Sequence, residues 1–296
     1  MNNLEVVERL KALDLTDASV DDVREVVMCF APKILRMRVS GDLFIERLRE
    51  GIGYTKRCDV SYKLGANTDE WNRATVPGRS IFYGTLTHPN EDPTNRRYIA
   101  ICESSKLYRQ GPSAAGVEMY TLSRWLPMRE IKVGFIANNS VFQNKNNRFL
   151  KEAKEFLSEQ GGLFIDESMY FSEYVDYVTE EFSKPVAPNE RYKYKISAVI
   201  ADCMMYMSGL DGVIYPSVQV GGEAGMNIAL KKECVDEVLW LNNVVELVYN
   251  QKHYEAYVHI TRHSKPIEKD SHGMLNWKWN NSVQRDVLRG TVVTNL

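Results

Sequence analysis

The stretch WNRATVPGRSIFYG, residues 71–84, combines residues that could do chemistry with residues that build a turn. Arg73 stands just before a Pro-Gly turn, and the short apolar strand that follows ends on Tyr83. A purely structural hairpin needs the turn and the strand, but it has no use for a cation at that place. A guanidinium binds phosphate or carboxylate with paired hydrogen bonds, and an aromatic ring attracts a flat cation. What Arg73 and Tyr83 do depends on which other residues meet them in space.

Two further polar residues follow apolar runs that predict strands. Glu103 ends the run YIAICES, and Ser217 follows DGVIYP. Taken singly, a solvated strand end explains Glu103, and a turn explains Ser217, because Ser is common where strands end. The glycine-rich GGEAG at 221–225 lacks the pattern of a phosphate-binding loop and leads into a strand, which indicates a tight connection.

The length and the net charge of the chain exclude several classes of protein. The chain has 296 residues, enough for a sizeable core, and a formal net charge of -2. This balance argues against broad attraction to nucleic acid or to an anionic membrane. No apolar run approaches the ~20 residues of a membrane span, and the acidic amphipathic N-terminus does not resemble a signal peptide.

Cysteine and histidine usage points away from disulfides and metals. The five cysteines are scattered without a CxxC pair, which is typical of free thiols in a reducing compartment and predicts a cytoplasmic protein. His259 and His263 have HxxxH spacing, but they lie in a stretch that predicts a strand. Positions four apart on a strand are ~13 Å apart, so we expect no shared metal.

The elements that must position these residues can be read from periodicity. Helices are expected at residues 4–12, 20–30, 147–162, 168–183 and 190–209, with Asp17 and Ser19 as caps before the second. Strands are expected at 33–39, 80–86, 98–104, 116–127, 130–137, 211–218, 226–230, 244–250 and 254–261, with residues 40–72 irregular. Short strands with helices inserted in blocks favour an α+β fold over a doubly wound sheet.

Read together, four motifs resemble the RES domain, a family named for its Arg, Glu and Ser. Arg73 and Tyr83 stand ten positions apart around the Pro-Gly turn, and Glu103 closes the next segment. The stretch YPSVQVGGEAGMNIAL, which contains Ser217, matches the closing element of the family. The resemblance extends to RMR at 36–38 and covers roughly residues 34–231. Asn72 precedes the arginine where the family often has Asn after it, and the loop at 87–97 is longer than in compact members.

The resemblance implies a fold and an activity. It implies an ADP-ribosyltransferase-like split β-sheet core with flanking helices, and a toxin of a toxin–antitoxin pair that destroys NAD+. NAD+ is then the substrate and no metal is expected. Cleavage of the nicotinamide–ribose bond builds an oxocarbenium-like cation, which Glu103 would stabilise. Arg73, supported by Arg36 or Arg38, would bind phosphate or ribose, Tyr83 the nicotinamide ring, and Ser217 the ribose or the carboxylate.

Three hypotheses stay open. The first is an NAD+ glycohydrolase or phosphorylase, according to whether water or phosphate attacks. The second is a protein ADP-ribosyltransferase, and the third is a nucleotide- or antitoxin-binding module with little turnover. The predicted division is an N-terminal helical region at 1–32, a RES domain at 33–240 and a β-rich extension at 241–296. Candidate partners are a protein antitoxin and a second copy of the chain, with no direct nucleic acid and no membrane.

Overall fold

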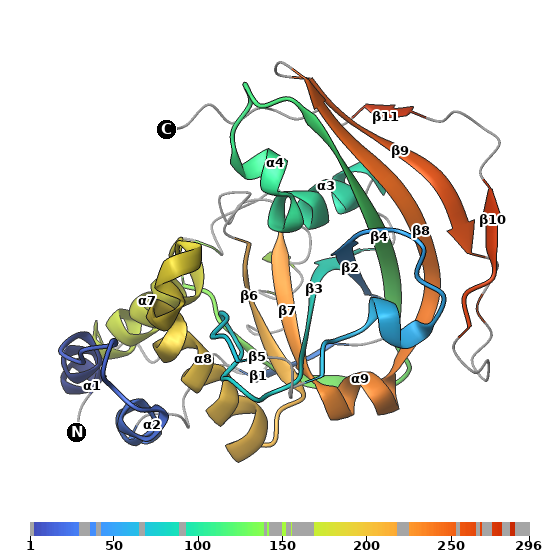
Figure 1. Cartoon of the computed structure of the whole chain (residues 1–296). Helices are drawn as coiled ribbons and strands as arrows, with labels where there is room; N and C mark the ends of the chain where they lie inside the picture. The colour runs from blue at the N-terminus through green and yellow to red at the C-terminus, as the bar shows by residue number, and fades with distance from the viewer. Residues whose placement is uncertain are drawn as a thin grey trace. The chain divides into compact units, whose positions relative to one another are not determined.

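The computed structural model forms two compact units whose segments alternate along the chain (Figure 1). Unit 1 consists of Met1–Ser40, Tyr62–Tyr83 and Arg129–Val238, and unit 2 of Gly41–Ser61, Gly84–Met128 and Leu239–Leu296. The structure describes residues 3–29, 36–39, 43–64, 69–88, 93–138, 141, 150–151, 155, 169–217, 225–252, 255–264, 267, 274–279 and 285–287. The predicted division into consecutive regions at 1–32, 33–240 and 241–296 stays a prediction.

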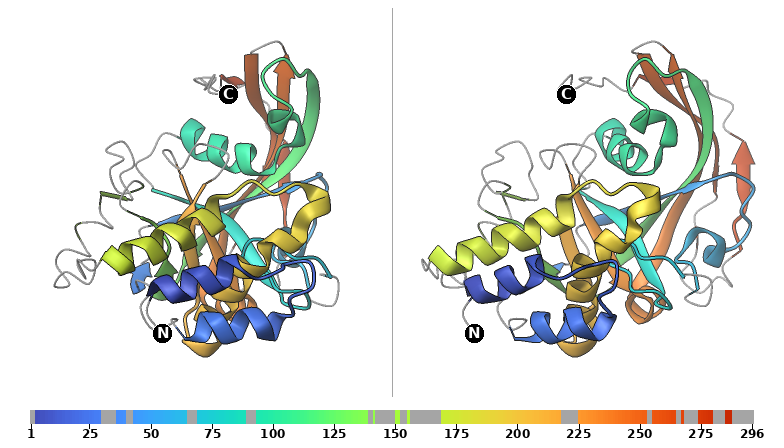
Figure 2. Two further views of the ribbon diagram at one scale, coloured as in Figure 1. Left: turned by 90° about the vertical axis from the view of Figure 1, so that its left-hand side faces the viewer. Right: turned by 60° about the vertical axis from the view of Figure 1, so that its left-hand side comes forward.

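Unit 1 has a helical layer built from both ends of its sequence. Its helices are α1 (Asn3–Lys11), α2 (Val20–Met28), α7 (Met169–Ser183) and α8 (Lys195–Asp202). Helix α1 packs on α7 and α2 packs on α8, so that residues distant in sequence lie side by side (Figure 2). The 3-10 segment Pro188–Tyr194 precedes α8, and the π-helical segment Cys203–Met207 follows it. The helices expected at 4–12, 20–30, 168–183 and 190–209 are therefore confirmed.

The start of α2 shows how the sequence fixes an element locally. Ser19 accepts a hydrogen bond from the backbone N–H of Asp22, and the Asp22 carboxylate accepts one from the N–H of Ser19. This reciprocal pair satisfies two of the N–H groups that a helix start leaves open. Val23, Val26 and Val27 then face the core, which makes α2 a helix with one buried side. Ser19 is confirmed as the cap.

The strands of unit 1 form one stretch of sheet. Strand β1 (Arg36–Val39) is antiparallel to β5 (Ile131–Phe135), and β5 is parallel to β6 (Gly212–Pro216). Strand β6 is antiparallel to β7 (Met226–Lys231), which continues into helix α9 (Lys232–Val238). Every residue of β6 is buried. Such a strand reads as a continuous apolar run, which is why the sequence predicts it.

Unit 2 is a long antiparallel sheet with two helices on one face. Strand β2 (Phe44–Glu50) pairs with β3 (Ile81–Thr87) and with β4 (Gly116–Pro127). Strand β4 also pairs with β8 (Leu239–Lys252), and β8 with β9 (Glu255–Ser264). The short strands β10 (Trp277–Trp279) and β11 (Arg285–Val287) both pair with β9. Ile81–Tyr83 of β3 belong to unit 1 and the rest of that strand to unit 2.

The helices α3 (Pro93–Ser104) and α4 (Lys106–Arg109) cover a cluster of buried side chains in unit 2. Ala100 and Ile101 of α3 pack there with Tyr120 of β4 and Leu247 of β8. The molecule is thus a mixed fold of helices and an open sheet, compatible with the predicted α+β class.

Two expectations are wrong, and one helix was missed. YIAICES, predicted as a strand at 98–104, lies in helix α3. Its alternating β-branched residues mimic a strand, but the segment packs on β2 and α4 as a helix. The segment 40–72, expected to be irregular, contains β2 and the 3-10 helix η2 (Arg57–Val60). Helix α9 was not expected at all. The helix predicted at 147–162 falls largely outside the described residues.

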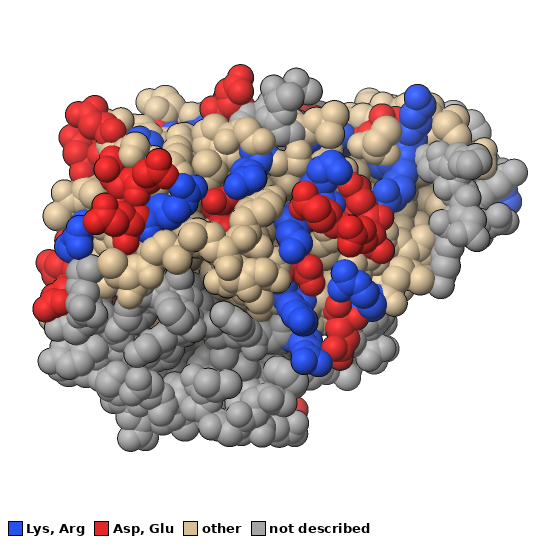
Figure 3. All heavy atoms as spheres, turned by 90° about the horizontal axis from the view of Figure 1, so that it is seen from below, with Lys and Arg blue, Asp and Glu red and all other residues tan. Residues whose placement is uncertain are grey.

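Charges of both signs alternate on the face seen in Figure 3. Exposed ion pairs between neighbouring elements or turns include Arg38–Glu130, Lys106–Glu50 and Lys232–Asp236. Such pairs each stabilise a protein by about 0–1 kcal/mol. Among the described residues, no helix is both long and apolar enough to cross a membrane.

Gly212 provides a test of the β6–β7 packing. A Cβ atom at this position would lie closer than 3.0 Å to the backbone carbonyl oxygen of Ala229, which cannot move without disturbing β7. At Gly134, an added Cβ would meet mainly the flexible end of the Met204 side chain. We expect Gly212→Ala to lower the free energy of unfolding by about 3 kcal/mol or more, and Gly134→Ala by about 1–2 kcal/mol. Urea denaturation measures both, and equal losses would contradict this account.

Candidate functional site

The turn that contains Arg73 and strand β3, which carries Tyr83, meet in unit 1. Asn72 and Thr75 exchange backbone hydrogen bonds of 3.1 and 3.0 Å, which close the turn. Strand β3 then brings Tyr83 back to it. The Tyr83 hydroxyl accepts a hydrogen bond of 2.9 Å from the Ala74 N–H and lies 2.6 Å from the Thr75 hydroxyl. The ten-residue spacing of Arg73 and Tyr83 is thus the length that returns the ring to the turn.

Burial keeps the Tyr83 phenol protonated to a higher pH than an exposed tyrosine. It raises the pKa of Tyr83 to about 12, while the hydrogen bonds from Thr75 and Ala74 and the positive charge of Arg73 oppose the rise in part. The phenol is therefore neutral at physiological pH.

Arg73 binds the end of helix α7. Its guanidinium donates hydrogen bonds to the carbonyl oxygens of Phe182 and of Lys184, the latter at 3.1 Å. These carbonyls belong to the terminal groups that a helix leaves without an internal partner. The guanidinium also lies over the ring of Tyr194, 5.1 Å from its centroid. The two hydrogen bonds to the carbonyl oxygens use two of the five N–H groups of the guanidinium. The phosphate-binding role of Arg73 stays a prediction.

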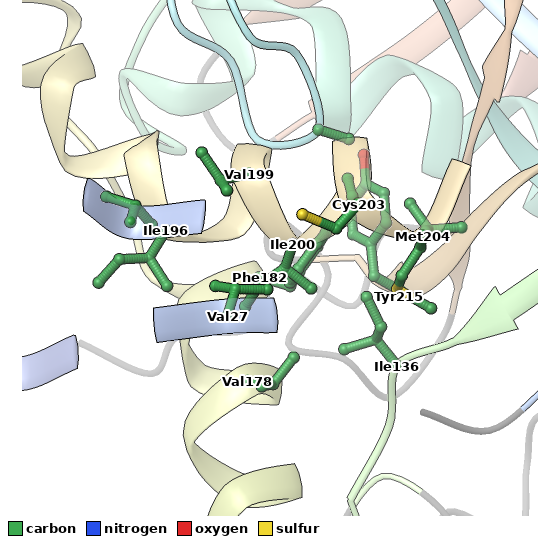
Figure 4. Close-up of a cluster of buried hydrophobic side chains, with 14 of the residues drawn as sticks. Val27, Ile136, Val178, Phe182, Ile196, Val199, Ile200, Cys203, Met204 and Tyr215 are labelled. Carbon is green, nitrogen blue, oxygen red and sulfur yellow. The ribbon is translucent and has the colours of Figure 1, made fainter. Parts of the chain in front are cut away.

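Phe182 connects the end of α7 to strand β6. Its ring packs against the ring of Tyr215, with centroids 5.4 Å apart, inside the buried cluster of unit 1 (Figure 4). Ser217 follows Tyr215 by two positions and is buried. The Ser217 N–H donates a hydrogen bond of 2.9 Å to the carbonyl of Gly225, just before β7. The predicted strands at 211–218 and 226–230 are confirmed as β6 and β7.

The two arginines of β1 are described to different extents. Arg38 is exposed and pairs with Glu130 at 3.2 Å. Arg36 stands opposite Gly134 in the register of β1 and β5, and its side chain lies outside the described residues. Their support of a bound phosphate remains a prediction.

Glu103 lies in the last turn of α3, in unit 2, and not at the end of a strand as the sequence predicted. Its side chain is half-buried. Next to it, burial raises the pKa of the Cys102 thiol to about 12, and the negative charge of Glu103 adds to that rise. Arg73, Tyr83 and Ser217 lie in unit 1, so the convergence of Glu103 with them on a single site stays a prediction.

Glu181 is an acidic residue near Arg73 that the motifs did not indicate. It is buried, and burial raises the pKa of its carboxyl above the usual value, against the opposing effects of Lys184 and Arg73. Its carboxylate pairs with Lys184 at 2.6 Å. A buried carboxyl with a raised pKa is a common feature of functional sites, but ion pairs that only hold structure produce it too. In the sequence, Glu181 is one of two adjacent glutamates on an amphipathic helix. Nothing in that pattern indicates a functional residue.

Comparisons with known proteins identify no family for the chain. No protein-family model matches the chain, and no curated protein matches it either. Within the part of the chain that the structure describes, no group of three or more His, Cys, Asp or Glu residues is placed to hold a metal ion. The resemblance to the RES domain rests on the sequence motifs alone and stays a prediction.

The raised pKa of Tyr83 predicts a pH dependence. From about pH 10 to about pH 12 the unfolded chain releases the Tyr83 proton while the folded protein keeps it, so the free energy of unfolding falls with rising pH. We expect Tyr83→Phe to reduce this slope by up to one proton, and to lower stability at pH 7 by about 1–3 kcal/mol, because the Ala74 N–H loses its acceptor. Urea denaturation at pH 7, 10 and 11.5 measures both effects. An unchanged alkaline slope would show that the phenol is accessible to water.

Proposed function

We propose that the protein cleaves the nicotinamide–ribose bond of NAD+, as a cytoplasmic enzyme with an ADP-ribosyltransferase-like core. The observation that carries the proposal is the hydrogen bond from the Ala74 N–H to the Tyr83 hydroxyl, which joins two of the segments that resemble RES motifs. Support also comes from Phe182, which touches both the Arg73 guanidinium and the strand that leads to Ser217. These contacts explain why an arginine, a turn and a tyrosine occur at this spacing.

Each residue has a proposed role. The ring of Tyr83 attracts the cationic nicotinamide, by about 0.5–2 kcal/mol for a face-on contact. Arg73 binds phosphate or ribose with the N–H groups not given to helix α7, with Arg36 or Arg38 in support. Ser217 orients the ribose or the carboxylate. Glu103 stabilises the oxocarbenium-like cation that forms as the C–N bond breaks.

The acceptor completes the reaction. When water attacks the anomeric carbon, nicotinamide leaves with the bonding electron pair, and ADP-ribose and a proton are released. When inorganic phosphate attacks, ADP-ribose carries phosphate at that carbon. A protein side chain as the acceptor gives ADP-ribosylation, the second hypothesis. The third is a binding module, for which a protein antitoxin or a second copy of the chain is the partner.

The direct test is release of nicotinamide from NAD+. We expect the wild-type protein to release it, and Glu103→Gln to do so about 10²-fold more slowly, because the amide cannot offset the developing positive charge. Glu50→Gln, which alters an exposed carboxylate of the same unit, is the matched control and should retain full activity. Chromatography of nicotinamide with and without phosphate identifies the acceptor.

Each result separates the hypotheses. Phosphate dependence identifies a phosphorylase, and label transferred from NAD+ to protein identifies a transferase. Bound NAD+ that both proteins leave intact would favour the module. Equal release by the wild type and Glu103→Gln would remove Glu103 from the mechanism.

A toxin that destroys NAD+ should arrest growth when it is expressed alone. We expect induced expression to stop growth and to lower cellular NAD+, and Glu103→Gln to relieve both effects. Arg73→Lys should relieve them in part, since lysine keeps the charge but loses the paired donors. Arrest at equal strength by all three proteins, at equal expression, would contradict the toxin proposal.

A further inference from the structure

Three arginines attach the loop at residues 70–79 to the helical layer of unit 1. Arg73 binds the end of α7, while Arg191 and Arg79 bind near the two ends of the loop. The loop carries Arg73 and leads into strand β3, so its conformation decides where Arg73 lies relative to Tyr83. A surface loop is held in one conformation by the contacts of its side chains, so the strength of each attachment matters.

The attachment at the start of the loop is exposed. Arg191, in the 3-10 segment before α8, donates a hydrogen bond of 3.1 Å to the Asn72 side chain and pairs with Glu70 at 2.6 Å. The side chains of Arg191 and Glu70 are 37% and 67% exposed. Water screens such a pair, so its contribution to stability is small. Arg191 therefore fixes the start of the loop only weakly.

The attachment at the end of the loop uses a buried carboxylate. Arg79 Nε donates a hydrogen bond of 3.0 Å to Oδ1 of Asp202, the last residue of α8, whose side chain is only 6% exposed. The Arg79 guanidinium also lies over the Tyr206 ring, 4.1 Å from its centroid. A charged hydrogen bond to an enclosed acceptor, with a ring under the same cation, holds a side chain more firmly than an exposed pair does. Arg79 is therefore the stronger of the two attachments.

Tyr206 lies in a π-helical turn. This turn, Cys203–Met207, follows α8 directly, and the Ser208 N–H donates a hydrogen bond of 3.0 Å to the Cys203 carbonyl, five residues back. A π-helical turn adds one residue to a helix, is rare, and occurs frequently at functional sites. Here it contains the aromatic ring that lies under the Arg79 guanidinium.

The Pro-Gly turn transmits the position of Arg79 to the residues before it. The Arg79 N–H donates a hydrogen bond of 3.1 Å to the Val76 carbonyl, with Pro77 and Gly78 between them. Gly78 has a φ of +84°, which glycine adopts without strain, and the proline ring fixes its own φ. The turn is therefore stiff, and a contact that fixes Arg79 also fixes Val76.

The same carboxylate holds a second arginine. Arg24, on helix α2, binds Asp202 Oδ2 at 3.4 Å and also pairs with Asp21 of its own helix. The side chain of Arg24 is 31% exposed and that of Arg79 is 45% exposed. Asp202 therefore holds a helix through one oxygen and the loop through the other. Removal of either arginine leaves the carboxylate with the other one, so Arg24 is a matched control for Arg79.

We propose that Arg79 is a positioning residue for the loop at 70–79. Bound to Asp202, it holds the Pro-Gly turn, and the turn holds Thr75 with its hydroxyl 2.6 Å from that of Tyr83. A substitution of Arg79 therefore changes the loop first and the ligand contacts second. Its effect on the reaction rests on the proposed function, in which the loop and β3 supply residues that bind NAD+. Its effect on the loop rests on these contacts alone.

Hydrogen exchange of the full chain tests the position of the loop. We expect the amides of residues 72–76 to exchange about tenfold or more faster in Arg79→Met, because methionine fills similar space but has neither the charge nor the donors. In Arg24→Met the same amides should exchange within about twofold of wild type, and any increase should fall on α2. Mass spectrometry of peptic peptides measures the exchange, with peptides from strand β4 of unit 2 as the internal reference.

Two further variants cover the case in which Arg79→Met does not fold. Arg79→Lys keeps a cation near the Tyr206 ring but has no donor at the Nε position, and Tyr206→Leu keeps the ion pair but removes the ring. We expect each to raise exchange at residues 72–76 by about threefold, since each loses one of the two contacts. Wild-type exchange at these amides in both folded variants would contradict the role of Arg79.

The reaction provides a second readout. Under the proposed function, Arg79→Met should raise the KM for NAD+ about tenfold and lower kcat less than about threefold, because the loop is proposed to bind NAD+ and not to stabilise the developing cation. Arg24→Met should leave both constants within about twofold of wild type. A general loss of stability would instead lower the amount of active enzyme and leave the KM unchanged.

The outcomes separate this inference from the proposed activity. Faster exchange at 72–76 in Arg79→Met alone, in a protein that never releases nicotinamide, supports the positioning role and overturns the activity. Nicotinamide release by Arg79→Met with unchanged KM and unchanged exchange overturns the positioning role and leaves the activity standing. Equal exchange in Arg79→Met and Arg24→Met also overturns the role, because Asp202 would then only stabilise unit 1. Faster exchange with an unchanged KM supports the position of the loop and overturns its part in binding NAD+.

Discussion

The contact on which the proposed site depends is the hydrogen bond that the Ala74 N–H donates to the Tyr83 hydroxyl. The Tyr83 ring is packed against the core of unit 1, and its polar end must find partners in a place poor in water. The turn supplies them. Its closure fixes where Arg73 leaves the backbone, and Arg73 then reaches the carbonyls that end helix α7. One phenol therefore ties a strand, a turn and a helix into the same framework.

The two buried glutamate–arginine pairs of unit 2, Glu46–Arg124 and Glu246–Arg262, differ in their hydrogen bonding. Glu246 has a donor for each oxygen, which suits a pair that only holds strands and a loop together. Glu46 lies in the same sheet with an arginine of similar exposure, yet one of its oxygens receives no hydrogen bond from the described residues. Since both residues experience the same kind of burial, the difference lies in hydrogen bonding and not in solvation. An incomplete polar pair is destabilising by itself.

Much of the secondary structure could be predicted from the chain. Ser19, Asp22 and three spaced valines predict helix α2. An unbroken apolar run predicts strand β6. Helix α3 could not be predicted in the same way. Ile99 and Ile101 alternate like strand residues, and four consecutive side chains from Ile99 to Cys102 are buried, so the period gives no helical signal. The packing of α3 on β2 and on α4 stabilises the helical conformation. Glu103 therefore lies at the end of a helix and not at the end of a strand.

The sequence by itself determined which residue types are available and how far apart they stand: an arginine, a turn and a tyrosine ten positions on, with a YPS strand far downstream. It also determined the helices and strands whose period is unambiguous, because local periodicity and capping are properties of neighbouring residues. Only the tertiary structure decided that Arg73 binds the carbonyls of α7, that Phe182 lies against Tyr215, and that Glu46 keeps an oxygen without a donor. Those contacts join residues from distant parts of the chain, and hydrogen-bond satisfaction between such residues depends on packing that no local pattern records.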